Sequence, residues 1–160
     1  MNYQITPIKP DFDKDICHII KTVGAEFNAV GEGFGPGDAE VTNMSQHYSD
    51  SDRSIYQVGI INGKVVGGCG IAAFNNDPYI CELRKLFLLP CSRGFQLGSA
   101  LTISCLEYAK NNGYRQCYLE TLSTMKAAIG LYEKLGFVHL SQPLGVSPHN
   151  ACNVWMTNDL

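Results

Sequence analysis

The sequence lacks the features that mark nucleic-acid-binding and membrane proteins. Charged residues make up 17% of its 160 residues, Lys and Arg (12) are fewer than Asp and Glu (15), and no Lys/Arg cluster occurs. Such a mildly acidic balance offers no electrostatic footprint for nucleic acid. No apolar run approaches the ~20 residues that a bilayer span needs. We therefore expect neither a nucleic-acid partner nor a membrane partner.

The sequence also lacks the signs of an exported or metal-stabilised protein. Met1–Pro7 has neither the basic region nor the apolar stretch of a signal peptide, which predicts a cytoplasmic protein with reduced thiols. No two cysteines form a C-x-x-C pair, and zinc sites favour closely spaced ligands. We expect no metal, and we interpret the seven cysteines as small buried residues: Cys17, Cys69, Cys81, Cys91, Cys105, Cys117 and Cys152.

Residue patterns in the first half of the chain predict a strand, a helix and a three-stranded meander. A short extended start precedes apolar residues at helical spacing over residues 11–27. Residues 54–61 and 65–74 have strand composition, and Asn62-Gly63 between them favours a two-residue hairpin because both turn positions need φ > 0. Residues 79–89 predict the third strand.

The second half alternates helices and strands, predicted over residues 97–108, 117–121, 125–135, 137–140 and 153–157. The first of these helices connects two strands as a crossover, so the strands at 79–89 and 117–121 should lie side by side and parallel. No repeat or linker interrupts the pattern. The chain is predicted to be one α/β (α+β) domain over residues 1–160, with a mixed, mainly antiparallel sheet and flanking helices.

The segment Leu89–Ser99 joins a strand to the first turn of a helix. Unpaired N–H groups and the helix dipole favour an anion there, Gly94 and Gly98 allow close approach, and Arg93 can add a charge-assisted contact. Neither the Walker nor the G-x-G-x-x-G pattern is present. The segment predicts an anion site, and a plain strand-to-helix turn is the alternative.

Four segments, in order, resemble the motifs of the GNAT acetyltransferases: Glu82–Pro90 (ELRKLFLLP), Arg93–Leu101 (RGFQLGSAL), Leu119–Thr121 (LET) and Leu131–Phe137 (LYEKLGF). This resemblance implies acetyl-CoA as the cosubstrate. It also implies a fold in which two parallel strands splay apart, so that the pantetheine arm lies between them like an extra strand.

The resemblance further implies which residues bind the cofactor. Backbone groups of Phe87 and Leu88 are expected to pair with the pantetheine arm. The pyrophosphate is expected to meet the following loop, which consists of Arg93, Gly94, Phe95, Gln96, Leu97, Gly98 and Ser99. Gln96 departs from the family pattern, because it replaces the first motif glycine. Its N–H remains, but its side chain would crowd the phosphates if φ at this position were positive.

The reaction implied is acetyl transfer to a primary amine, of a small molecule or a peptide, by direct attack in a ternary complex. An amine with a pKa near ~10.4 is neutral about once in 10³ molecules at pH 7, so a base is needed. Glu82 is the candidate and Glu120 its rival; alternatively, Glu82 only pairs with Arg84 on the same strand face. Tyr132 matches the tyrosine that often protonates the CoA thiolate in the family, and a core position is its alternative.

Other chemistries are weaker. Cys91 or Cys117 could act as a nucleophile in a ping-pong route, but no His stands beside either in sequence. A catalytically silent CoA-binding regulatory module would keep the pyrophosphate loop alone. A different acyl donor or an O-linked acceptor is a third alternative.

The stretch from Thr22 to Asp52 contains no Lys or Arg but six acidic residues, namely Glu26, Glu32, Asp38, Glu40, Asp50 and Asp52. Together with its glycines, this predicts a loop that closes over the acceptor and attracts a cationic amine, and a solvated loop is the alternative. An exposed closing strand could pair with a second copy of the chain as a homodimer.

Overall fold

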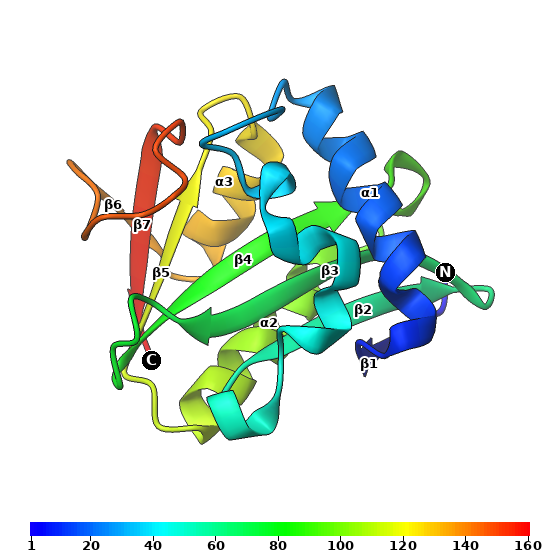
Figure 1. Cartoon of the computed structure of the whole chain (residues 1–160), viewed down its shortest axis with the longest axis horizontal. Coiled ribbons are helices and arrows are strands. Elements are labelled where there is room, and N and C mark those ends of the chain that lie inside the picture. The colour runs from blue at the N-terminus through cyan, green and yellow to red at the C-terminus, as the bar shows by residue number, and fades with distance from the viewer.

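The computed structural model describes residues 1–160 and forms one seven-stranded sheet in the order β1-β2-β3-β4-β5-β7-β6 (Figure 1). All neighbouring strands are antiparallel except β4 and β5, so the predicted mixed, mainly antiparallel sheet is confirmed. The strands are β1 (Tyr3–Pro7), β2 (Ile55–Ile61), β3 (Lys64–Ala73), β4 (Ile80–Leu88), β5 (Gln116–Thr121), β6 (Val138–Leu140) and β7 (Val154–Asp159). The helices are α1 (Asp13–Glu26), α2 (Leu97–Asn111) and α3 (Lys126–Lys134).

Five short 3₁₀ segments complete the chain: η1 (Pro10–Phe12), η2 (Gly35–Gly37), η3 (Ala39–Gln46), η4 (Asp50–Asp52) and η5 (Pro90–Ser92). The helix expected over 11–27 is α1, which starts two residues later because η1 precedes it. The aperiodic stretch before β2 folds as η2, η3 and η4, and η3 is the short helix expected near Asp38.

Helices cover both faces of the sheet. In Figure 1, α1 and η3 lie in front of β3 and β4, and α2 lies behind them. The front core contains Ile16, Ile20 and Met44, whereas the core behind the sheet contains Leu101 and Tyr132. None of the helices has both the length and the apolar character needed to cross a membrane. The sheet ends at β6, where the expected pairing with a second copy stays a prediction.

A β-bulge in β4 shapes the centre of the sheet. The register passes from Gly70 opposite Arg84 to Gly68 opposite Phe87, so that Lys85 and Leu86 share one partner position. Lys85 has φ +52°, a left-handed conformation that side chains rarely adopt. Such a bulge bends its strand and increases the local twist.

Two contacts hold this bulge in place. The Tyr56 hydroxyl, on β2, donates a hydrogen bond to the Lys85 carbonyl oxygen at 2.8 Å. The Tyr56 ring reaches it across β3, where a Cβ added at Gly68 would lie 2.4 Å from that ring. The glycine at this position therefore makes room for the aromatic side chain that fixes the bend.

The two parallel strands separate just before the bulge. Pairing between β4 and β5 covers Ile80–Glu82 opposite Gln116–Tyr118 and then stops. Glu82 thus stands where the strands begin to diverge, and the edge of β4 from Leu83 to Leu88 has no partner strand on that side. The splayed pair implied by the family resemblance is present.

Candidate active site

Two connected cavities form a cleft beside the free edge of β4. The wider end of this cleft is a cavity of about 350 Å³ between the end of β4 and the start of α3. Phe87, Leu88 and most of the predicted loop line it from one side, and Met125 and Ala127 line it from the other. The carboxyl end of β4 therefore opens into this cavity, as expected for ligand sites in such sheets. Phe95 is the one predicted cofactor residue outside this lining; its side chain is 40% exposed.

The loop before α2 contains two residues with positive φ, and its role as an anion site stays a prediction. Gly94 has φ +82° and Gln96 has φ +62°. Gln96 is the N-cap residue of α2, yet its side chain makes no capping hydrogen bond. The structure thus places Gln96 in the left-handed conformation that a glycine would adopt more readily.

The Arg93 side chain is already engaged by protein groups. Its guanidinium donates two hydrogen bonds to the Glu26 carboxylate, at 2.6 and 2.8 Å, and two to the Leu88 carbonyl oxygen, at 3.2 and 3.0 Å. These contacts tie the end of α1 to the end of β4. A contact between Arg93 and a cofactor phosphate stays a prediction.

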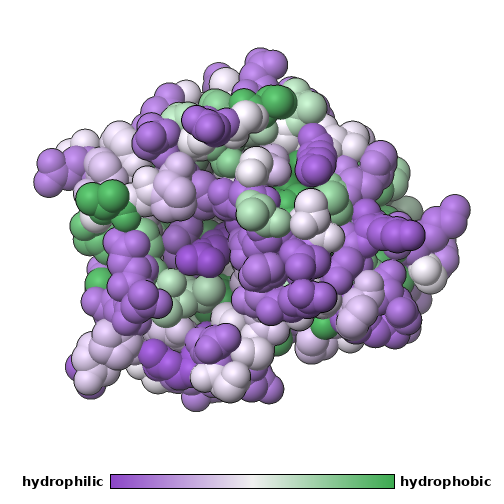
Figure 2. All heavy atoms as spheres, in the orientation of Figure 1, coloured by the Kyte–Doolittle hydropathy of each residue, from purple (hydrophilic) through white to green (hydrophobic).

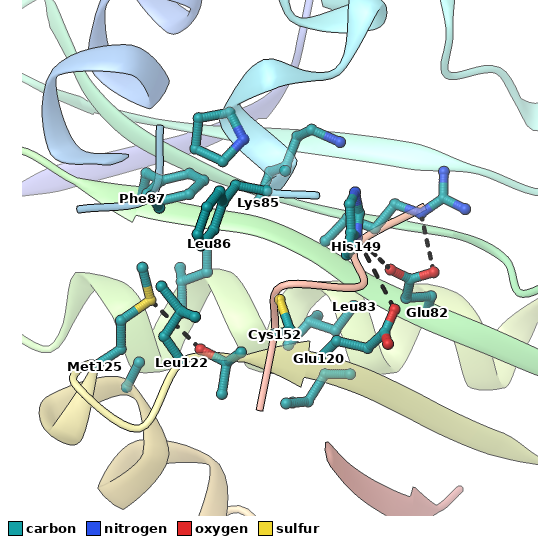
Figure 3. A pocket seen from close by; sticks show the side chains of 18 of the residues that line it. Glu82, Leu83, Lys85, Leu86, Phe87, Glu120, Leu122, Met125, His149 and Cys152 are labelled. Atoms are coloured by element: carbon teal, nitrogen blue, oxygen red, sulfur yellow. Dashed lines mark hydrogen bonds and ion pairs between the residues drawn. The ribbon is translucent and has the colours of Figure 1, made fainter. Parts of the chain in front are cut away.

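The narrower end of the cleft is a cavity of about 80 Å³ that shares lining residues Leu86, Phe87, Met125 and Ala128 with the wider one. Its polar lining includes Glu82, Glu120 and His149 (Figure 3). The two predicted carboxylates thus lie in the same cavity, together with a histidine that the sequence did not single out. Because the cavities share residues, they are two ends of one cleft.

His149 lies between Asp38 on one side and the carboxylates of Glu82 and Glu120 on the other. Its Nε2 lies 2.7 Å from Asp38 Oδ2, and its Nδ1 lies 3.8 Å from Glu82 Oε1 and 4.0 Å from Glu120 Oε1. Glu120 Oε1 is buried without a hydrogen-bond partner. One ligand atom from each of Glu82, Glu120 and His149 lies within 4.8 Å of the others, so this set could also hold a divalent cation.

The environment of these groups shifts their protonation. Burial raises the pKa of Glu82, although Arg84 and His149 act against this. The hydrogen bond that His149 donates to the Asp38 carboxylate raises the pKa of His149, in spite of burial. Burial alone would raise the pKa of Asp38, but His149 and Lys85 bring it below its usual value. Glu82 is therefore a stronger base than a solvated carboxylate, and His149 Nδ1 lies 3.8 Å from it.

Tyr132, on α3, is both a core residue and part of the cleft. Its ring packs against Phe137 with centroids 5.7 Å apart, and its residue exposure is 6%. It also lines the narrow cavity. Burial raises the pKa of Tyr132 well above its usual value, so the hydroxyl is protonated at neutral pH but is a weaker acid than a solvated tyrosine.

The acidic stretch is not the free anionic surface that its composition predicts. Lys85, with 3% of its side chain exposed, places Nζ 2.8 Å from Asp38 and 2.5 Å from Glu40. Glu26 is paired with Arg93, and Asp50 accepts a hydrogen bond from the Tyr108 hydroxyl. The expected attraction of a cationic acceptor therefore loses most of its support.

The cysteine route also loses support. Cys91 is exposed and Cys117 is buried, and neither lines the cleft. Burial raises the pKa of the Cys117 thiol well above its usual value, the reverse of what a nucleophile needs.

Comparison with known proteins adds an independent line of evidence. The model of the acetyltransferase (GNAT) family matches residues 26–137. The chain belongs to the GNAT acetyltransferase family. The match spans both splayed strands, the loop before α2 and all of α3.

Individual relatives agree with this assignment. An uncharacterized N-acetyltransferase of Escherichia coli (strain K12), YjgM, is 38% identical over 91% of this chain and 87% of its own length. The N-acetylaspartate synthetase of Xenopus tropicalis is 33% identical over 69% of this chain, which spans 39% of that longer protein. The solved structure of yncA, a putative acetyltransferase from Salmonella typhimurium with acetyl-CoA, has the same fold, with a TM-score of 0.77 and 20% identity over 99% of this chain and 94% of that one.

Proposed function

We propose that this acetyltransferase moves the acetyl group of acetyl-CoA to a primary amine by direct attack within a ternary complex. The cleft between β4 and β5 carries the proposal, because it leads from a loop of backbone donors to the carboxylate of Glu82. The relatives support it: the yncA structure contains acetyl-CoA, and the N-acetylaspartate synthetases are named for an acetylated amine.

Acetyl-CoA would lie along the free edge of β4. Unpaired backbone groups of Phe87 and Leu88 would bond the pantetheine arm like a neighbouring strand. The pyrophosphate would accept hydrogen bonds from amides of the loop Gly94–Ser99, at the positive end of the α2 dipole. This placement directs the thioester toward Glu82, where the strands diverge.

Glu82 would take the proton of the attacking amine, directly or through a water molecule. Its pKa, raised by burial and by the nearby carboxylate of Glu120, improves it as a base, and His149 partly offsets this shift. Two buried carboxylates so close together favour a cation between them, so the acceptor can bind as its abundant ammonium form. Tyr132 would then donate its hydroxyl proton to the departing CoA thiolate.

A turnover assay with an amine panel tests the proposal. The wild type should release free thiol from acetyl-CoA in the presence of an accepted amine. E82Q should lower kcat/KM by about 10²- to 10⁴-fold, the usual contribution of a general base, without weakening acetyl-CoA binding. E133Q, a change to an exposed carboxylate on α3, is the matched control.

The same assay distinguishes an active acetyltransferase from a catalytically silent CoA-binding regulatory module. A module would bind acetyl-CoA and turn over no amine. Full activity of E82Q would instead show that another group removes the proton.

A further inference from the structure

Arg84 is a basic side chain that the mechanism above does not use. It lies on β4, two residues after Glu82, and lines the same narrow cavity as Glu82 and His149. One quarter of its side chain, 25%, is exposed, so it can be reached from the opening of the site. Figure 2 shows hydrophilic side chains across the face that carries η3, which is also the face of Asp38 and Glu40.

The guanidinium of Arg84 has few good partners. It donates a long hydrogen bond, 3.4 Å, to the Ala73 carbonyl oxygen. Its Nε lies 3.6 Å from the Glu82 carboxylate, beyond hydrogen-bonding distance, and is buried without a partner. A guanidinium has five N–H donors, and leaving buried donors unpaired is unfavourable.

Two other basic residues near the cleft, Lys85 and Arg93, form closer ion pairs than Arg84 does. Lys85 contacts two carboxylates at 2.8 and 2.5 Å, and Arg93 binds Glu26 through two hydrogen bonds. Both are neutralised within the protein. Arg84 also lines the cavity, but it is held more loosely, by a 3.6 Å ion pair with Glu82 and one long hydrogen bond to Ala73, so the outer part of its guanidinium can accept a carboxylate partner.

We infer that the acceptor is a free α-amino acid, whose carboxylate binds Arg84 while its amine faces Glu82. This inference rests on the proposed function and specifies its substrate class. In an α-amino acid the amine and the carboxylate are separated by one carbon, so neighbouring acidic and basic side chains 3.6 Å apart suit the pair. A lysine side chain within a peptide carries no such carboxylate beside its amine.

The test compares α-amino acids with their α-amides in steady-state turnover. Each pair shares its side chain but differs in the negative charge, which also makes the amine of the acid more basic than that of the amide; the change of the ratio between wild type and R84Q is therefore the measurement. The wild type should favour the acids, and R84Q should lower the acid-to-amide ratio of kcat/KM by about 10- to 100-fold, the loss of a charge-assisted contact. Using the ratio cancels any effect on Glu82 or on folding, since such effects act on both acceptors.

Two further variants sharpen the result. R84K keeps the charge without the fork and should give an intermediate ratio. R115Q removes an arginine that stacks on Tyr79 away from the cleft, and should leave the ratio unchanged.

The outcomes separate the two proposals. An unchanged ratio in R84Q would overturn the amino-acid assignment while amine acetylation stands. Absence of turnover with every amine, charged or not, would overturn the proposed function and this assignment with it.

Discussion

Replacing Gln96 with glycine should stabilise the protein, although it deletes a whole side chain. Gln96 is exposed, has φ +62° and makes no capping hydrogen bond, so nothing favourable is lost. A non-glycine residue in this conformation costs about 1–2 kcal/mol. Glycine also gives the unfolded chain more freedom, which offsets about 0.4–1 kcal/mol. The free energy of unfolding should therefore rise by about 0.5–1 kcal/mol in Q96G.

Urea unfolding followed by far-UV circular dichroism measures this change. G94A is the matched control, because Gly94 is also exposed and has φ +82°, and an added Cβ there would meet nothing within 4 Å. It should lower stability by about 1 kcal/mol through backbone strain alone. Acetyl-CoA should bind Q96G at least as tightly as the wild type, since the backbone N–H remains. A less stable Q96G would refute the reasoning that left-handed strain is stored at this loop.

Three further predictions concern the site. K85M should lower the free energy of unfolding by about 2–3 kcal/mol in urea titrations, because Asp38 and Glu40 lose their cation. The loss should be smaller than for a fully buried pair, since both carboxylates keep some exposure. An unchanged unfolding midpoint would contradict this prediction. With an acceptor amine of low pKa, kcat/KM should rise with pH through an ionisation above the usual range of a glutamate, because the base must be deprotonated and burial raises the pKa of Glu82. This rising limb should vanish in E82Q, and its persistence there would assign it to another group. Y132F should lower kcat on the order of 10²-fold in thiol-release assays while retaining acetyl-CoA affinity; a kcat equal to that of the wild type would remove Tyr132 from the reaction.

Local patterns in the sequence sufficed for most of the fold. Asn62-Gly63 adopts the positive φ values, +50° and +76°, that its hairpin requires. The helix over 125–135 is α3, and the closing strand pair is β6 and β7. These features depend on neighbouring residues, so composition and spacing reveal them.

Features that depend on distant residues were not predictable. The bulge at Lys85 interrupts a run of strand-forming residues without any glycine or proline, and Tyr56 and Gly68 on other strands hold it in place. His149 reaches the site through Asp38, 111 residues earlier in the chain. Nothing beside His149 in sequence indicates that meeting.

Charge counting along the chain was misleading for the same reason. The acidic stretch before β2 contains no Lys or Arg, which indicates a free anionic surface. Its partners come from elsewhere: Lys85 on β4 and Arg93 after η5. Only the fold reveals that Arg84, between Glu82 and Lys85, lines the narrow cavity with part of its side chain exposed.

Calorimetric titration of the folded protein with acetyl-CoA, followed in the same sample by an accepted α-amino acid, tests the central claim most directly. The account predicts saturable heat from acetyl-CoA at one site per chain, and thiol release once the amino acid is added. A folded protein that gives no heat with acetyl-CoA or coenzyme A would contradict it, because the cleft between β4 and β5 would then have no part in cofactor binding.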